Sequence, residues 1–225
     1  MDCKKKYTCA LVGASECNMS ELTNRTYDTY IAVDGGYAHL QEAHITPDLA
    51  LGDFDSLGFV PDTVACEVHP VAKDASDLAL ALRRAAERGA THIDVFGALG
   101  GRPDHTFATY QALAGAAASG IVVRAFGCDG GVVVLHAPEK GSLCKELTVL
   151  TLPAIAGETF SVFACTDVCT HVTIKGFRYE LIDGELTNDT PLGLSNVTLE
   201  TPGTISLEQG TLMVFLPEVL MRALA

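Results

Sequence analysis

Short apolar runs alternate with helix-forming stretches through the first 126 residues, and this alternation constrains the fold more than any other feature. The runs expected to form strands lie at residues 7–12, 30–33, 48–51, 64–68, 93–96 and 121–126. A short helix is expected in YAHLQEAH, and longer ones from Lys73 to Gly89 and from Pro103 to Gly120. Such alternation is typical of an open, mostly parallel α/β sheet, which binds its ligands at the carboxyl ends of the strands.

The pattern changes after about residue 135. Helical periodicity stops, and short segments such as TVLTL, FSVFAC, HVTIKG and NVTLE follow one another with turns between them. Many short strands separated by turns predict an all-β sandwich or barrel. We therefore expect a three-layer, Rossmann-like α/β domain over residues 1–138 and an all-β sandwich domain over residues 139–225.

Composition excludes several classes of partner. The 225 residues carry a formal net charge of −13, which argues against a surface for nucleic acid or for an anionic membrane. The eight cysteines are scattered without a CxxC pair. A chain of this length does not need disulfides to fold, so we expect reduced thiols and a cytoplasmic location. No apolar segment reaches the ~20 residues that span a bilayer.

Carboxylates gather where strands are expected to end. The loop GDFDS places Asp53 and Asp55 two residues apart directly after an apolar run, and Asp77 lies near the start of the next helix. Neighbouring carboxylates repel each other unless a cation or a proton lies between them. Mg²⁺ takes one or two carboxylates and completes its shell with water and substrate phosphates. These loops together predict a magnesium site, although the DxD pattern alone also fits an acidic surface turn.

Glycines and cations in other loops complement these carboxylates. Asp34-Gly35-Gly36 follows the second apolar run, and Gly100 to His105 opens a later helix. A glycine turn lets backbone N–H groups approach a phosphate at a helix N-terminus, while Lys73, Arg102 and His105 supply positive charge. Neither GxxxxGK[ST] nor GxGxxG occurs, which excludes a P-loop enzyme and a typical dinucleotide-binding domain. The combination predicts metal-assisted chemistry on a polyphosphate.

Four motifs taken together resemble those of the thiamine pyrophosphokinase family. They are DGG, PDLALGDFDS, KDASDLALAL and GALGGRPDH, in this order and spacing. Further along, GFRYELIDGEL followed by GLSN is similar to the C-terminal motif of that family. The resemblance spans nearly the whole chain. It implies transfer of the pyrophosphate group of ATP to the hydroxyl of thiamine, with release of AMP, in a homodimer whose active sites are shared between chains.

The resemblance also implies roles for individual residues. Asp53, Asp55 and Asp77 would bind Mg²⁺ and, with Asp34, form the catalytic group. Asp34 would also line the site near the metal or the thiamine. Which group takes the proton of the thiamine hydroxyl stays open among Asp34, Asp55 and Asp77.

The remaining implied residues would hold the two substrates. Those implied to bind ATP are Lys73, Ser76, Gly100, Gly101, Arg102, Asp104 and His105. Those implied to contact thiamine are Ser195 and Asn196, which belong to the GLSN segment. The α/β domain would therefore bind ATP and Mg²⁺, and the β-sandwich domain would bind thiamine and form the dimer.

Two other functions fit the same residues. A metal-dependent hydrolase of phosphate esters also uses clustered carboxylates, and a non-catalytic sensor of thiamine or a nucleotide would retain the same binding site. The cations around GGRPDH favour a larger polyphosphate over a simple phosphate ester. The presence of all three metal-binding carboxylates argues against a decayed enzyme.

Overall fold

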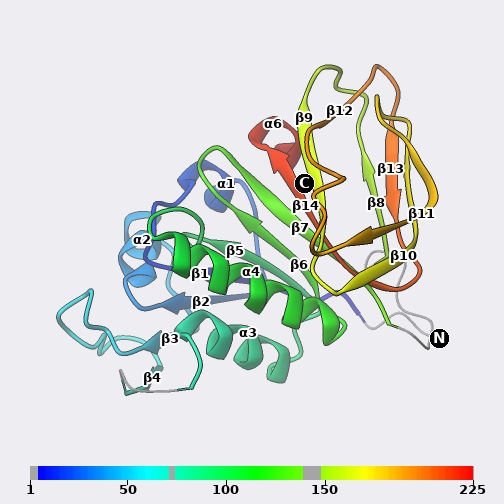
Figure 1. Cartoon of the computed structure of the whole chain (residues 1–225). Coiled ribbons are helices and arrows are strands. Elements are labelled where there is room, and N and C mark those ends of the chain that lie inside the picture. Colours follow the sequence, from blue (N-terminus) through cyan, green and yellow to red (C-terminus); the bar gives the residue numbers. More distant parts are fainter. Residues whose placement is uncertain (1–4, 71–73, 139–147, 225) are drawn as a thin grey trace. The chain divides into compact units, whose positions relative to one another are not determined.

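The computed structural model describes residues 5–70, 74–138 and 148–224 (Figure 1). The chain forms two compact units. The first comprises residues 1–113 and 123–128, and the second comprises residues 114–122 and 129–225. The division into domains at residue 138 stays a prediction.

The first unit is built on six strands in the order β6-β5-β1-β2-β3-β4. The strands are β1 (Thr8–Val12), β2 (Thr29–Val33), β3 (Leu49–Gly52), β4 (Cys66–Val68), β5 (His92–Phe96) and β6 (Val122–Phe126). β1 pairs in parallel with both β2 and β5, with Leu11 opposite Ile31 and Val95. Residues 9–12 of β1 are fully buried, as expected for a central parallel strand covered by helices on both faces. The predicted α/β sheet is therefore confirmed.

The helices of this part follow the predicted order, with one addition. They are α1 (Met19–Thr23), α2 (Gly36–Glu42), α3 (Asp77–Glu87) and α4 (Pro103–Ala118). The helix predicted from Lys73 begins at Asp77, because Ser76 caps it by accepting the backbone N–H of Ala79 at 3.3 Å. α3 buries Leu78, Leu82 and Ala85 and packs against β1, β2 and β3. The five-residue helix α1 was not predicted.

The strand order reverses at β1, and we call this reversal the switch point of the sheet. It determines where the site lies. The chain runs from β1 through β2 and β3 to β4 in one direction, then returns past β1 to β5. Because such crossovers are right-handed, α1 and α2 lie on one face of the sheet and α3 on the other. The connections that follow β1 and β5 therefore continue to opposite faces of the sheet, and a crevice forms at the carboxyl ends of these two strands.

The second unit contains two antiparallel sheets, with strand orders β12-β9-β14-β7 and β11-β10-β13-β8. The strands are β7 (Gly130–Ala137), β8 (Val149–Leu152), β9 (Thr159–Ala164), β10 (Val168–Lys175), β11 (Leu181–Thr187), β12 (Asn196–Val197), β13 (Gly203–Ser206) and β14 (Gly210–Pro217). Their buried side chains alternate along the strands, as Val172 and Ile174 do on β10. The predicted β-sandwich is confirmed. The strand β7 and the final helix α6 (Glu218–Arg222) were not predicted.

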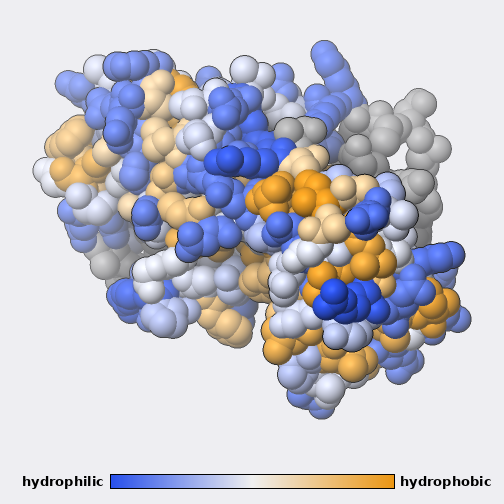
Figure 2. Space-filling view, turned by 90° about the horizontal axis from the view of Figure 1, so that it is seen from above, coloured by the Kyte–Doolittle hydropathy of each residue, from blue (hydrophilic) through white to orange (hydrophobic). Residues whose placement is uncertain are grey.

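Apolar side chains also reach the surface of the second unit. Figure 2 shows orange apolar surface among blue polar surface on the face that it views. The exposed apolar residues of the second unit include Tyr179, Ile182, Leu192 and Leu194, each more than half exposed. Contiguous exposed apolar surface is a feature of binding sites. Among the described residues, no helix is long and apolar enough to cross a membrane.

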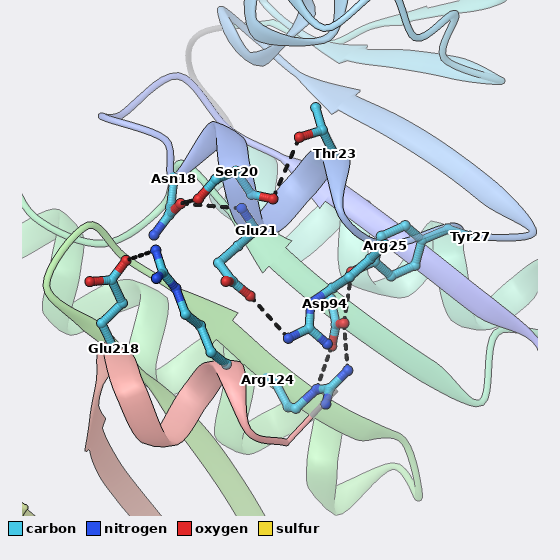
Figure 3. Close-up of polar contacts among 10 residues, drawn as sticks. Asn18, Ser20, Glu21, Thr23, Arg25, Tyr27, Asp94, Arg124 and Glu218 are labelled. Carbon is cyan, nitrogen blue, oxygen red and sulfur yellow. Dashed lines mark hydrogen bonds and ion pairs between the residues drawn. The ribbon is translucent and has the colours of Figure 1, made fainter.

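An ion pair between Asp94 and Arg124 joins β5 to β6 next to the switch point (Figure 3). Asp94 on β5 is 4% exposed. Its carboxylate accepts from the Nε and Nη2 of Arg124 at 2.7 and 2.6 Å and from the hydroxyl of Tyr27 at 2.8 Å. Burial and the adjacent charge of Asp94 raise the pKa of Tyr27, so Tyr27 remains a donor. The contacts link β5 to β6 and to the segment that enters β2.

Candidate active site

A cleft of about 270 Å³ opens at the switch point of the first unit. Its walls come from the ends of β1, β2 and β5 and from the first turns of α3 and α4. Four of the residues predicted for the site line this cleft: Asp34, Ser76, Asp77 and His105. The structure therefore gathers side chains that are up to 71 positions apart in the sequence onto one edge of the sheet.

The backbones after β1 and β5 approach each other so closely that they form one platform beneath the cleft. The N–H of Gly13 donates to the carbonyl of Phe96, and the N–H of Ser15 donates to the carbonyl of Gly97, both at 2.8 Å. A Cβ on Gly13 would collide with the carbonyl oxygen of Gly97, and the reverse holds too. Gly97 begins the glycine turn that was expected to approach a phosphate, whereas Gly13 was not assigned to the site from the sequence. The signal was available, because Gly13 directly follows a buried strand.

Asp34 organises the neighbouring loop as well as lining the cleft. Its φ of 49° lies in the left-handed region, which is uncommon for a residue other than glycine. One carboxylate oxygen, Oδ1, accepts the backbone N–H of Asp53 at 3.0 Å and that of Phe54 at 3.4 Å. The N–H of Asp34 donates to the carbonyl of Leu51 at 2.9 Å. Asp34 therefore fixes the start of the DFDS loop from the end of the adjacent strand.

Three carboxylates influence one another at this edge. Burial and the negative charge of Asp77 raise the pKa of Asp34 to about 6; Asp53 raises it further, while the N–H groups of Phe54 and Asp53 oppose the shift. Such mutual repulsion is relieved when a cation lies between the groups. Carboxylate oxygens are the ligands that Mg²⁺ prefers. The chemistry of this donor set therefore fits a divalent cation.

The residues predicted to bind the metal do not form a complete set of protein ligands. Asp55 is exposed, and its backbone N–H donates to Oδ1 of Asp53 at 3.1 Å. Within the described ranges, no three His, Cys, Asp or Glu side chains form a group that could hold a metal ion. Mg²⁺ is usually bound by one or two carboxylates, with water and substrate phosphates as its other ligands. The donor set therefore fits an ion that is shared with a phosphorylated ligand.

The loop before α4 presents cationic and glycine residues at the start of a 16-residue helix. Gly100 and Gly101 have φ values of 87° and 72°, which favour glycine. Arg102 donates from Nε and Nη2 to the two carboxylate oxygens of Asp104, at 3.2 and 2.6 Å. The pairing raises the pKa of Arg102 and lowers that of Asp104. Both side chains are exposed, so the pair is weak and Arg102 can exchange its partner for a phosphate.

The two residues predicted to contact thiamine differ in their exposure and in their hydrogen bonds. Ser195 is exposed, has a φ of 60°, and donates its backbone N–H to Oγ of Ser161 at 3.1 Å. Asn196 is only 6% exposed, and its side chain binds the backbone of Tyr179. Lys73, the remaining predicted cation, lies outside the described residues.

We expect Asp34→Asn to raise the melting temperature in the absence of metal above about pH 6, by about 2–4 °C for each kcal/mol gained. The folded-state pKa of Asp34, about 6, lies above the ordinary value of 3.8. The folded state therefore holds this proton more tightly than the unfolded state, and that contribution to stability is lost as pH rises from about 4 to 6. Asparagine stays neutral and keeps an oxygen to accept the loop N–H groups.

Thermal unfolding across this pH range, with chelator present, tests the expectation. The melting-temperature difference between variant and wild type should grow with pH and should shrink when Mg²⁺ is added. Asp62→Asn, which removes an exposed charge from the same loop region, serves as the matched control and should show no such step. A pH-independent difference for Asp34→Asn would mean that this carboxylate does not titrate near 6.

Comparison with known proteins adds a separate line of evidence. A model described as "Thiamin pyrophosphokinase, catalytic domain" matches residues 21–125, and one described as "Thiamin pyrophosphokinase, vitamin B1 binding domain" matches residues 147–212. Together they match more than half of the chain. The thiamine pyrophosphokinase of Bacillus subtilis (strain 168) is 27% identical over 212 residues, which cover 91% of this chain and 95% of that protein.

Solved structures show the same fold. A crystal structure of thiamine pyrophosphokinase from Bacillus subtilis has a TM-score of 0.75 at 24% identity, and covers 93% of this chain and 98% of that one. The protein from Geobacillus thermodenitrificans has a TM-score of 0.73 at 25% identity, with coverage of 94% and 97%. These likenesses extend over both compact units.

Proposed function

The chain belongs to the thiamine pyrophosphokinase family, and from this premise we propose that the cleft at its switch point is where pyrophosphate is transferred. The chain moves the pyrophosphate group of ATP to the hydroxyl of thiamine and releases AMP. One observation carries the location of the site: Asp34 and Asp77 line a cleft that the first turns of two helices also border. Helix N-termini attract phosphate, whereas carboxylates attract the accompanying cation.

ATP is held at the first turns of α3 and α4. Ser76 caps α3, and Arg102 directly precedes α4, whose first turn contributes His105 to the cleft. The proposed ATP-binding residues are Lys73, Ser76, Gly100, Gly101, Arg102, Asp104 and His105. The role of Asp104 is to orient Arg102, since the two form a bidentate pair. The guanidinium then turns to the phosphates when ATP binds.

Asp53, Asp55 and Asp77 are the proposed Mg²⁺ residues, with Asp34 fixing the loop that carries two of them. The bound ion would neutralise charge on the phosphates and on the departing AMP. Asp34 contributes by holding the backbone N–H of Asp53. The mutual repulsion of these carboxylates supports the assignment.

The transfer itself requires alignment more than covalent help from the protein. The hydroxyl oxygen of thiamine forms a bond to the β-phosphorus, and the bond from that phosphorus to the oxygen bridging the α-phosphate breaks. AMP leaves with the bridging oxygen, and the hydroxyl proton passes to a carboxylate or to water. Asp34, Asp55 and Asp77 are the carboxylates available for this proton. A loose transition state needs little base strength, so alignment of the two substrates is the larger contribution.

Product analysis tests this function. The protein is incubated with ATP, Mg²⁺ and thiamine, and the products are separated by chromatography. We expect AMP and thiamine diphosphate in equal amounts. ADP with thiamine monophosphate would identify a γ-phosphoryl kinase instead, inorganic phosphate alone would identify a hydrolase, and binding of thiamine without any product would identify a sensor.

We further propose a homodimer whose active sites are shared between two chains, in an isologous arrangement. The division of the site residues supports it, because Asp34, Asp53 and Asp77 lie in the first unit and Ser195 lies in the second. Sedimentation equilibrium should give about twice the chain mass of 23.7 kDa. A cytoplasmic location is supported by the free thiols of Cys9, Cys17, Cys66, Cys128, Cys165 and Cys169.

A further inference from the structure

Threonine hydroxyls bind two carbonyl groups of the loop between β5 and α4. We call residues 97–102 the glycine loop. The hydroxyl of Thr109 donates to the carbonyl of Ala98 at 3.1 Å, and the hydroxyl of Thr106 donates to the carbonyl of Gly100 at 3.0 Å. Both threonines belong to α4. Two side-chain hydrogen bonds therefore attach the glycine loop to the helix that follows it.

The N–H groups of the same peptide units point the other way. In a planar trans peptide, the carbonyl and the N–H of the next residue point in opposite directions. Because the carbonyls of Ala98 and Gly100 are directed at α4, the N–H groups of Leu99 and Gly101 are directed away from it. Within the part of the chain that the structure describes, neither N–H donates to a protein acceptor. The glycine loop thus leaves two donors for a ligand.

The geometry of α4 explains why these two hydroxyls reach the loop. Residues three apart lie on the same face of a helix, and helical side chains tilt toward the N-terminus, which here adjoins the glycine loop. The hydroxyl of Thr106 also lies 3.3 Å from the carbonyl of Arg102, so its one proton serves two carbonyls of the loop. The three glycines of the loop all have a positive φ and lose much conformational freedom when they are held. The hydroxyls therefore restrain a segment that is flexible by composition.

The donors that the glycine loop leaves free suit an anion. Backbone N–H groups of glycine-rich loops bind phosphate at the start of a helix. Ala98 and Thr109 line the cleft at the switch point, and Arg102 adds a positive charge at the end of the loop. Resting on the proposed function, we infer that Thr106 and Thr109 are positioning residues, whose hydroxyls aim the two free N–H groups of the glycine loop at the phosphates of ATP.

The Michaelis constants of the two substrates test the positioning role. Thr106→Val keeps the shape of the side chain and removes the hydroxyl. The KM for ATP should therefore rise about 3- to 10-fold, the range of one neutral hydrogen bond, while the KM for thiamine stays unchanged. Thr106→Ser keeps the hydroxyl and should show the wild-type KM for ATP. An equal rise in both KM values would mean that the hydroxyl only supports the fold, and an unchanged KM for ATP in Thr106→Val would overturn the inference.

Nuclear magnetic resonance on protein with isotopically labelled glycine observes one of the donors directly. Magnesium tripolyphosphate serves as the probe, because it carries the phosphates of ATP without the nucleoside. The amide proton of Gly101 should move downfield when the probe binds to the wild type, and should move less far in Thr106→Val. An amide proton of Gly101 that does not move in the wild type at a saturating concentration of the probe would contradict the role given to this N–H.

Ser119→Ala is the matched control. The hydroxyl of Ser119 donates to the carbonyl of Gly115 at 3.0 Å, at the other end of α4. The change removes the same kind of hydrogen bond away from the glycine loop, so both KM values and the shift of Gly101 should stay as in the wild type. Thr109→Val should raise the KM for ATP as Thr106→Val does. Because Thr109 is only 7% exposed, its variant is first checked by a thermal melt, and Thr106 decides if that variant does not fold.

Product analysis of the wild type tests the proposed function without reference to either threonine. If the wild type makes AMP and thiamine diphosphate while Thr106→Val keeps a normal KM for ATP, the function stands and the positioning role is wrong. If the wild type makes neither product, the function is wrong, and the shift of Gly101 on adding magnesium tripolyphosphate decides by itself whether the glycine loop binds phosphate.

Discussion

Replacing Asp53 with asparagine is expected to lower kcat/KM for pyrophosphoryl transfer by at least about a hundredfold, the loss typical of removing one electrostatic contact to a transition state. Asp53 is one of two carboxylates whose charge raises the pKa of Asp34, so it lies where a cation is favoured. Asparagine removes the charge and keeps an oxygen that can accept the N–H of Asp55, as Oδ1 does at 3.1 Å. The loop should therefore stay in place, and folding should be slightly favoured because repulsion is relieved.

Steady-state kinetics across a range of Mg²⁺ concentrations measure this effect. The Mg²⁺ concentration that gives half-maximal activity should rise for Asp53→Asn, and should stay unchanged for the control Asp62→Asn, whose side chain is exposed. A melting temperature of Asp53→Asn no lower than that of the wild type would exclude a folding defect. Near-normal turnover of Asp53→Asn at saturating Mg²⁺ would remove this residue from the metal site.

The parts of the fold that could be predicted are those set by local sequence. Buried parallel strands read as continuous apolar runs, and the Ser76 cap with the apolar face of α3 marks a helix. The loops that follow such strands could then be placed at one edge by topology alone. The five residues of α1 are too few to show a helical period. The strand β7 was missed because its apolar run follows the glycines at 130 and 131 and shows no alternation.

The parts of the site that could not be predicted depend on long-range contacts. Gly13 and Gly97 meet across the switch point although they are 84 positions apart in the sequence. Asp34 was expected near a metal or a substrate. The hydrogen bond that its carboxylate accepts from the backbone of the DFDS loop depends on the pairing of β2 with β3. Asn196 was implied to contact thiamine, and only the tertiary structure shows that its side chain is buried and donates to the carbonyl of Tyr179. Residue type and spacing therefore indicated the chemistry, while the fold determined which atoms are free for it.

The ion pair of Asp94 and Arg124 also depends on a long-range contact. Its disruption has the largest expected effect on stability. Neither residue was singled out from the sequence, because an aspartate and an arginine 30 positions apart carry no local signal. The structure buries Asp94 and half-buries Arg124, with side-chain exposures of 5% and 23%, and joins them by two hydrogen bonds (Figure 3). Arg124 also lies over the ring of Phe126, at 5.5 Å from its centroid.

Arg124→Met should destabilise the protein by about 3–5 kcal/mol at neutral pH, because it leaves the buried charge of Asp94 without its cation. Urea unfolding followed by circular dichroism measures the loss. The double variant Asp94→Asn/Arg124→Met keeps an acceptor for the Tyr27 hydroxyl, which donates to Asp94 at 2.8 Å in the wild type. It should therefore regain at least half of the lost stability. If the double variant is as unstable as Arg124→Met at neutral pH, the loss comes from packing against Phe126 and not from the buried charge.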